Sequence, residues 1–413
     1  MDYLLTDRQQ HLVEWVGELA DKFADRAAEH DRDASFPFDN YADLRESGYL
    51  RLTVPEEFGG LGATLHELIL AQERLAMGDA STALAVQMHV SPIAQMADMW
   101  RTTKDPAMEP FFRDIASGKV VWASLTSERG IGNSITDSSV KAERVDGGYR
   151  ISGRKIFCTN TEVATHCSLT ARYEDPDRGP QVLILRTAMD AAGLKLVHTW
   201  DTLGMRSTQS NDLEIDGLFV PEHEVIHSFP ANHLDAVVVK TVFAHAMPVF
   251  GAVYIGIAGG AMDWARDWAL KGGKQDDPEI QHLFAQMEIL RQTARSVIWR
   301  FADEIESGEL LTRRGVQEAL ANAVIAKHVA CTNATQILDL VFDVVGGSAY
   351  HKRFPIERMY RDVRAGTVMP YNSREAHRLL GRNVLGIEVL PENPLDDSLA
   401  AFQAPGGAGG GAA

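Results

Sequence analysis

The sequence is poor in cysteine and in positive charge. Its 413 residues include only three cysteines, Cys158, Cys167 and Cys331, and their spacing matches no metal-ligand pattern. A sparse, odd set of cysteines is typical of a reducing compartment, so we expect a cytoplasmic protein without structural disulfides or a metal. Forty basic residues against 57 acidic ones give a net charge of −17. Because such a field repels phosphate backbones, we expect no nucleic-acid partner.

Several signals that define common protein classes are also missing. The amino terminus lacks the basic stretch and the apolar run of a secretory signal. No run reaches eighteen consecutive apolar residues, so we expect no membrane-spanning segment. There is no Gly-x-Gly-x-x-Gly after a strand, no phosphate-binding loop ending in Gly-Lys-Ser/Thr and no Gly-x-Ser-x-Gly. These absences argue against nicotinamide-binding folds, P-loop nucleotidases and the common serine hydrolases.

The spacing of the apolar residues changes twice along the chain. It is helical from Thr6 to about Trp100, and capping boxes begin helices at Thr6 and at Thr64. It alternates from about Val120 to Val220, with a hairpin signal at Asp146-Gly147-Gly148. Helical spacing returns from about Leu234 to Gly386. Helices, then an antiparallel β block, then long helices argue against alternating βαβ units.

Six short segments carry further information because of their order. They are Val54–Gly62, Leu125–Ser134, Gly153–Asn160, Leu203–Thr208, Val345–Tyr350 and the pair Arg361-Asp362. In this order they resemble motifs of the acyl-CoA dehydrogenase superfamily, and the resemblance covers roughly residues 5–388. One segment alone is weak evidence, but a series in register is strong.

The resemblance implies an α+β fold of three domains. We expect an N-terminal all-helical domain over residues 1–119 and a middle antiparallel β-barrel or sandwich domain over residues 120–230. A C-terminal four-helix bundle would follow over residues 231–390, and residues 391–413 would form a flexible Gly-rich tail. Family members are usually homotetramers, so we expect a homo-oligomer, either a tetramer or a dimer.

The resemblance also implies a flavin between the last two domains, FAD with FMN not excluded. By motif position, Ser127 would donate toward N1/O2 of the flavin ring and the Thr159 hydroxyl toward N5, where hydride lands. Phe157 would shield the ring from water, and Leu125 belongs to the same cofactor-binding segment. The backbone of Gly346-Gly347 would let a phosphate or adenine approach closely. Asn133, Met369 and Pro370 would line the substrate site.

Other positions depart from the family pattern. Most members carry a glutamate base eight residues after the Arg-Asp pair, where this sequence has Pro370. Some members carry it on the first long C-terminal helix, where this sequence has Ala246. The arginine near the CoA chain aligns with Met247, and an FAD-holding Arg-x-x-Phe-Gly is replaced by 271–276, Lys-Gly-Gly-Lys-Gln-Asp. Lysine lacks the bidentate fork of arginine, so the flavin could be exchangeable.

Two histidines are the candidates for proton chemistry. A third predicted helix, from Ser81 to about Met99, is apolar nearly all round and should be buried; His89 lies on it. In this family that segment lies near the flavin, and His245 lies next to Ala246. Histidine suits proton transfer near neutral pH, so we predict both as catalytic. Each could instead be a hydrogen-bonded core residue, and Glu375 is a weaker third candidate.

Three functions remain open at this point. The first is acyl-CoA dehydrogenase-type desaturation of an acyl thioester, bound to CoA or a carrier protein, with electrons passing to an electron-transfer flavoprotein. The breadth of the resemblance to the family places desaturation slightly ahead of the other two functions. The second is a reduced-flavin-dependent monooxygenase, supplied by a flavin reductase, in which a C4a-peroxyflavin hydroxylates a small molecule. The third is a non-catalytic flavin-binding homologue.

Overall fold

The amino-terminal helices begin where the capping boxes predict. The computed structural model describes residues 4–131 and 134–393. Thr6 and Thr64 each exchange both capping-box hydrogen bonds, at the starts of α1 and α3. The helices of this region are α1 (Asp7–Asp33), α2 (Phe38–Ser47), α3 (Leu65–Gly78), α4 (Ala80–Thr103) and α5 (Glu109–Ala116). As predicted, α4 is buried over most of its length.

The middle region is one eight-stranded sheet. Its strands are β1 (Trp122–Leu125), β2 (Lys141–Val145), β3 (Gly148–Lys155), β4 (His166–Asp175), β5 (Gly179–Ala188), β6 (Leu194–Val197), β7 (Asp212–Pro221) and β8 (Val225–Pro230). The order is β6-β7-β3-β2-β4-β5-β8, and β1 pairs with β4. The predicted hairpin joins β2 to β3. The sheet is not wholly antiparallel, however, because β4 pairs in parallel with both β1 and β2.

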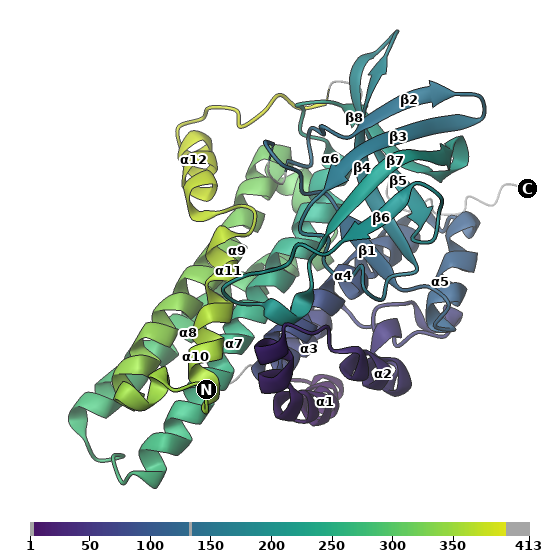
Figure 1. Ribbon diagram of the computed structural model, residues 1–413. Helices are drawn as coiled ribbons and strands as arrows, with labels where there is room; N and C mark the ends of the chain where they lie inside the picture. Colours follow the sequence, from purple (N-terminus) through teal and green to yellow (C-terminus); the bar gives the residue numbers. More distant parts are fainter. Residues whose placement is uncertain (1–3, 132–133, 394–413) are drawn as a thin grey trace, which may run out of the picture.

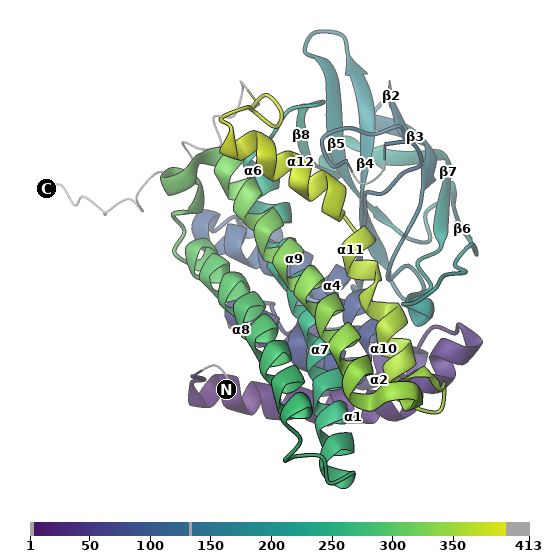
Figure 2. The same cartoon turned by 90° about the vertical axis from the view of Figure 1, so that its left-hand side faces the viewer.

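The carboxyl-terminal region is built on three long helices, α7 (Ala244–Lys271), α8 (Pro278–Glu306) and α9 (Leu310–Val345). The fourth member of the predicted bundle is broken into α10 (Pro355–Val363), α11 (Ala365–Val368) and α12 (Ser373–Val384), each of which contacts α9 (Figure 2). A short α6 (Ala236–Val238) and a π-helical turn, Val239–Phe243, lead into α7.

Two of the long helices correct the sequence-based argument about membranes. The segments Ala236–Lys271 and Leu310–Tyr350 are long and apolar enough to cross a membrane, judged by length and composition. Within their most apolar windows, however, 67% and 50% of the residues are buried inside the protein. Their place in the packed bundle therefore accounts for their apolar character.

The two helical regions share one hydrophobic core, and the sheet has another. Buried residues of α1, α3 and α4 form a continuous cluster with those of α7, α8 and α9. The strands bury a separate cluster. In Figure 1 the strands lie above the helices, and α4 runs between the sheet and α7, both of which it contacts. The 3₁₀ turn Arg206–Thr208, in the loop before β7, also contacts α1 and α4.

Candidate functional site

The two predicted flavin-binding segments of the sheet lie side by side. The Ile156 N–H donates to the Ser127 carbonyl at 2.9 Å, which joins the loop after β1 to the loop after β3. Thr159 follows in the second loop, half-buried, and its Oγ1 lies 2.8 Å from Oγ of Ser210. Leu125 is buried in the core of the sheet, so only its backbone can face a cofactor.

Phe157 has the exposure that a shielding residue needs. Its side chain is 54% exposed, on a backbone with φ of 53°, and the edge of its ring meets Trp200 at a centroid distance of 5.8 Å. Exposure of this degree excludes a core role. An exposed phenylalanine and a partly buried tryptophan, close in sequence to the Thr159 hydroxyl, suit a flat, polar-edged ring such as a flavin.

A buried ion pair fixes the loop that carries Ser127. Glu128 and Lys155 form a salt bridge in which both side chains are completely buried. Glu128 also accepts from Ser138 Oγ at 2.6 Å and from the Val140 N–H at 3.2 Å. Burial is the largest single influence and opposes ionisation of Glu128, but the charge of Lys155 and the hydrogen bonds from Lys155, Ser138 and Ser139 together outweigh it, so the pKa of Glu128 is lowered. The carboxylate therefore closes the 128–140 loop at its base.

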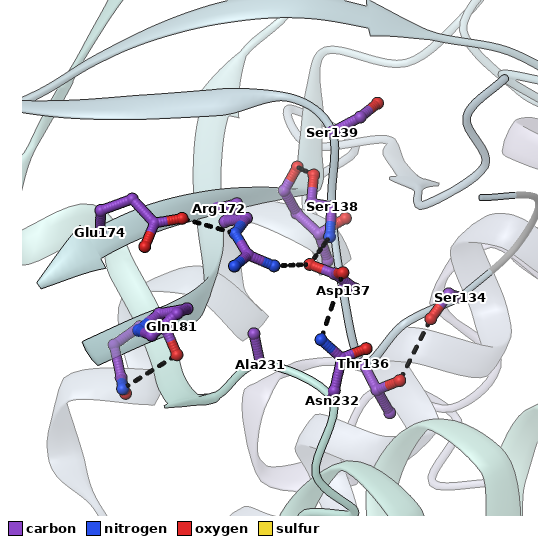
Figure 3. A network of polar contacts seen from close by, with 12 residues as sticks. Ser134, Thr136, Asp137, Ser138, Ser139, Arg172, Glu174, Gln181, Ala231 and Asn232 are labelled. Atoms are coloured by element: carbon purple, nitrogen blue, oxygen red, sulfur yellow. Dashed lines mark hydrogen bonds and ion pairs between the residues drawn. The ribbon is translucent and has the colours of Figure 1, made fainter. Parts of the chain in front are cut away.

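A second polar network holds the outer part of the same loop (Figure 3). Asp137 accepts from Arg172 of β4 at 2.7 Å, and Arg172 also bonds Glu174 at 2.7 Å. The Asn232 N–H donates to the Thr136 carbonyl at 2.6 Å. The loop is thus tied both to the sheet and to the segment that leads into α6.

The other side of the site is formed by the segment 366–371, which a single buried lysine holds in place. Lys327 of α9 is 1% exposed, and its Nζ donates to the carbonyls of Gly366, Met369 and Tyr371 at 2.5, 2.8 and 3.1 Å. Burial lowers the pKa of Lys327. These bonds fix the turn that contains Pro370, at the position of the missing glutamate.

The predicted substrate residues lie on this turn or outside the described residues. The Tyr254 hydroxyl contacts Sδ of Met369 at 2.9 Å. A pocket of about 270 Å³ is lined, among others, by Ile131, Ser134 and Thr136 of the flavin loop and by Pro370 and Tyr371. The loop that follows Ser127 and the turn that contains Pro370 therefore line the same pocket. Asn133 lies outside the described residues.

The geometry of His89 favours a structural role over the predicted catalytic one. The imidazole is fully buried; Nε2 lies 2.7 Å from the Leu50 carbonyl, and Nδ1 accepts from the Trp122 N–H at 3.0 Å. Both ring nitrogens are therefore engaged by the backbone. Burial lowers the pKa of His89 to about 4, so the ring is neutral near pH 7. His89 ties α4 to β1.

His245 keeps its place as a candidate for proton transfer. It lies just after the π-helical turn, 4% exposed, with Nδ1 3.3 Å from the Lys240 carbonyl. Burial lowers the pKa of His245, whereas the charge of Asp98 on α4 opposes that shift. Phe243 in the same turn stacks on Tyr371 at a centroid distance of 5.8 Å, so this turn contacts the Pro370 wall. π-helical turns are frequent at functional sites.

No carboxylate replaces the family's base at the two expected positions. They hold Pro370 and Ala246. Glu375, the third candidate, is exposed at the start of α12, where it completes a capping box with Asn372. Its Oε2 accepts from the Asn372 N–H at 3.2 Å. Glu375 therefore helps to end the turn, and it also lines the 270 Å³ pocket beside Pro370.

Gly346 and Gly347, predicted to let a phosphate or adenine approach closely, lie elsewhere in the bundle, at the end of α9. Gly346 caps α9 with φ of 68°, a left-handed conformation that favours glycine, and a Cβ on Gly346 or Gly347 would meet no atom within 4 Å. Their segment, Gly346–Tyr350, contacts α9 and α10. The open space above them fits a close ligand approach, and the positive φ also fits an ordinary helix end. A larger cavity, about 1040 Å³ between α1, α7 and α10, contains none of the predicted flavin residues.

One motif in the sequence resembles a zinc-protease signature but lacks its structure. His223-Glu224-Val225-Ile226-His227 has the His-Glu-x-x-His spacing. That signature needs one helix face, whereas these residues pass from a 3₁₀ turn into β8. His227 bonds Asp235 at 3.0 Å. Among residues 4–131 and 134–393, no group of three or more His, Cys, Asp or Glu side chains could hold a metal.

Three residues that shape this site were not predicted from the sequence. Ser210 and Thr208 continue the hydrogen-bond chain from Thr159, but hydroxyls in a loop have no distinctive spacing. Lys327 had a usable signal, because it is a lone charge in the apolar stretch Val324–Ala330. A single cation on a buried helix face points to buried acceptors.

Comparison with known proteins identifies the family. The acyl-CoA dehydrogenase N-terminal, middle and C-terminal domains match residues 6–118, 123–218 and 236–370. The chain therefore belongs to the acyl-CoA dehydrogenase family, and it is a flavin-dependent oxidoreductase.

Its relatives include proteins named for different reactions. YdbM of Bacillus subtilis, assigned to the acyl-CoA dehydrogenases, is 28% identical over 380 residues, covering 89% of this chain and 95% of its own. Amino sugar nitrososynthase DnmZ of Streptomyces peucetius is 30% identical over 371 residues, covering 87% and 89%. A solved structure of KijD3 with FMN and a dTDP-linked amino keto sugar has a TM-score of 0.81 at 26% identity, covering 97% and 98%.

Proposed function

We propose that this protein is a reduced-flavin-dependent monooxygenase that takes its flavin as FMN from a separate flavin reductase. The observation that carries the proposal is the Pro370 turn. Desaturation of a thioester needs a base for the α-proton, and proline and alanine occupy both positions where the family carries one. Oxygen transfer from a reduced flavin does not need that base. The choice of mechanism therefore follows from one missing carboxylate.

The residues present fit a flavin on the sheet side of the site. Ser127 and Thr159 offer hydroxyls at adjacent loops, and Phe157 with Trp200 provides an apolar cover that excludes water. When bound, reduced flavin supplies the two electrons that activate dioxygen. Residues 271–276 replace the arginine and phenylalanine that usually hold FAD, and all are exposed. This replacement, together with the FMN in KijD3, supports FMN over FAD.

The remaining residues have roles in binding and proton handling. Lys327 fixes the Pro370 turn, so the substrate meets a rigid wall. Burial lowers the pKa of His245 and so favours the neutral imidazole, which can accept a proton from the substrate. The similarity to an amino sugar nitrososynthase favours a small molecule with an oxidisable nitrogen, in place of an acyl thioester. We expect the active form to be a homo-oligomer, as is usual in this family.

Product formation under defined electron supply tests the proposal. The purified protein, FMN, a flavin reductase and NADH are mixed in air with a panel of primary amines, and oxidised products are measured by mass spectrometry. Product that requires both oxygen and reductase is the expected result. His245→Asn should lower turnover at least tenfold, whereas His223→Asn, an exposed histidine, serves as the matched control.

Desaturation is the second candidate, and the resemblance to YdbM favours it. Anaerobic mixing of flavin-loaded protein with saturated acyl-CoAs distinguishes the two functions. Bleaching of the flavin by any acyl-CoA would overturn the monooxygenase proposal and support desaturation. Absence of bleaching together with oxygen-dependent product would exclude desaturation.

A further inference from the structure

Three hydroxyls form a continuous chain that leads inward from Thr159. Oγ1 of Thr159 lies 2.8 Å from Oγ of Ser210, which lies 2.8 Å from Oγ1 of Thr208. Thr208 then donates to the Met205 carbonyl at 2.9 Å. The chain passes from half-buried Thr159 to Ser210, 3% exposed, and to Thr208, which is fully buried. Only its outer end can meet a ligand.

The inner end of the chain sets its direction. A carbonyl oxygen accepts and cannot donate, so the hydrogen of Thr208 points to Met205 and its oxygen accepts from Ser210. Ser210 then accepts from Thr159. In this arrangement all three hydroxyl hydrogens have acceptors at 2.8–2.9 Å without any ligand.

The reversed direction contains one good hydrogen bond fewer. Thr208 would donate to Ser210 and Ser210 to Thr159, and the Thr159 hydrogen would have only the Phe157 carbonyl at 3.4 Å. The bond from Thr208 to Met205 would be lost. One ordinary hydrogen bond corresponds to about a fivefold change in a binding constant. Without a ligand, therefore, the outward side of Thr159 is a lone pair.

We propose that Ser210 and Thr208 make Thr159 a hydrogen-bond acceptor, and that the site thereby selects reduced over oxidised flavin. Reduced flavin carries a hydrogen on N5, which an acceptor satisfies. Oxidised flavin has a lone pair there, so its N5 bond would require the chain to reverse. This inference rests on the proposed function, because it needs the flavin at Thr159. It makes Ser210 and Thr208 positioning residues, which act through Thr159.

The ratio of two dissociation constants tests the inference. FMN is titrated into the purified protein in its oxidised form in air and in its dithionite-reduced form under nitrogen. The unmodified protein should bind reduced FMN at least about fivefold more tightly. Ser210→Ala removes the acceptor of Thr159 and should bring the ratio close to one. Thr208→Val leaves Ser210 only Thr159 as acceptor, and should move the ratio furthest toward oxidised FMN.

Matched variants separate this effect from general damage. Thr187→Val removes a buried threonine hydroxyl that bonds a backbone carbonyl on β5, and Ser228→Ala removes a buried serine hydroxyl on β8. Both should keep the ratio of the unmodified protein. Equal ratios in the unmodified protein, Ser210→Ala and Thr208→Val would overturn the inference while leaving the proposed function standing. Failure to bind FMN in either redox state would instead overturn the proposed function.

Discussion

The two walls of the site are each fixed by a fully buried lysine, but the partners of the two lysines differ. On the sheet side Lys155 pairs with the carboxylate of Glu128 and also bonds Thr170 at 2.8 Å. On the helical side Lys327 bonds three backbone carbonyls, and among residues 4–131 and 134–393 it bonds no carboxylate. Burial lowers the pKa of both lysines.

The difference shows two ways to hold a loop rigid. A buried ion pair is neutral as a unit, and removing one partner leaves an uncompensated charge. A lysine among carbonyls keeps its charge with only dipoles to balance it, so it depends more on pH. The sheet wall should therefore be the more sensitive to mutation and the helical wall the more sensitive to proton concentration.

Breaking the ion pair should have the largest effect. Glu128→Gln leaves Lys155 buried and unpaired, so we expect a loss of about 3–5 kcal/mol in the free energy of unfolding, measured by urea denaturation. Glu222→Gln, which breaks the exposed pair with Arg144, should cost less than about 1 kcal/mol. The double variant Glu128→Gln/Lys155→Met should recover part of the loss. Equal losses in the buried and exposed pairs would remove the distinction between the walls.

His89, a buried group that is neutral near pH 7, allows a comparison with the two lysines in how stability depends on pH. Its pKa falls from 6.5 in the unfolded chain to about 4 in the fold. Between these values only the unfolded chain binds the proton, so stability falls as the pH drops from 6.5 to 4, by about 3 kcal/mol. His89→Gln should flatten this part of the pH–stability curve, and turnover at pH 7.5 should remain in the folded variant. Loss of turnover without loss of folding would restore the catalytic prediction.

Removing the charge of the helical wall should have a smaller effect. Lys327→Met deprives three carbonyls of their donor but also removes a buried charge, so we expect a net loss of about 2 kcal/mol at pH 7. Because the folded pKa lies below 10.5, the unfolded chain binds more protons in the window just below 10.5, and stability rises with pH there. The variant should lose that rise, whereas Lys195→Met, on an exposed side chain, should keep it.

The smallest expected effect concerns the end of the same turn. Glu375→Gln keeps an acceptor for the Asn372 N–H, so the unfolding free energy should change by less than about 0.5 kcal/mol. Thermal denaturation followed by circular dichroism gives this value. A hundredfold fall in turnover in this variant would show that Glu375 acts as the base after all.

Much of the fold follows from the sequence because its signals are local. The capping boxes at Thr6 and Thr64 and the Asp146-Gly147 hairpin require only neighbouring residues, and all three are confirmed. The parallel pairing of β4 with β1 and β2 joins distant segments, and alternation of apolar residues carries no direction. The predicted domain boundaries stay predictions.

The site was less predictable because it depends on what side chains contact. Motif position selected Ser127 and Thr159, whose loops a backbone hydrogen bond joins, and their roles toward a flavin stay predictions. Motif position could not reveal that both nitrogens of His89 are engaged by the backbone. A histidine on a buried helix looks the same in sequence whether it faces a substrate or a carbonyl. The roles assigned to His245, Gly346-Gly347, Met369 and Pro370 stay predictions.

The π-helical turn at Val239–Phe243 has a consequence for how this bundle tolerates insertions and deletions. Such a turn accommodates one residue more than an α-helix over the same rise. Deleting a single residue from this stretch would let it relax into regular α-helix and leave α7 and its packing against α9 in place. The same deletion would keep the flanking segments in register but would change which side chain of the turn faces Tyr371, where Phe243 now stacks. A one-residue change in length here would thus alter the lining of the pocket without altering the architecture.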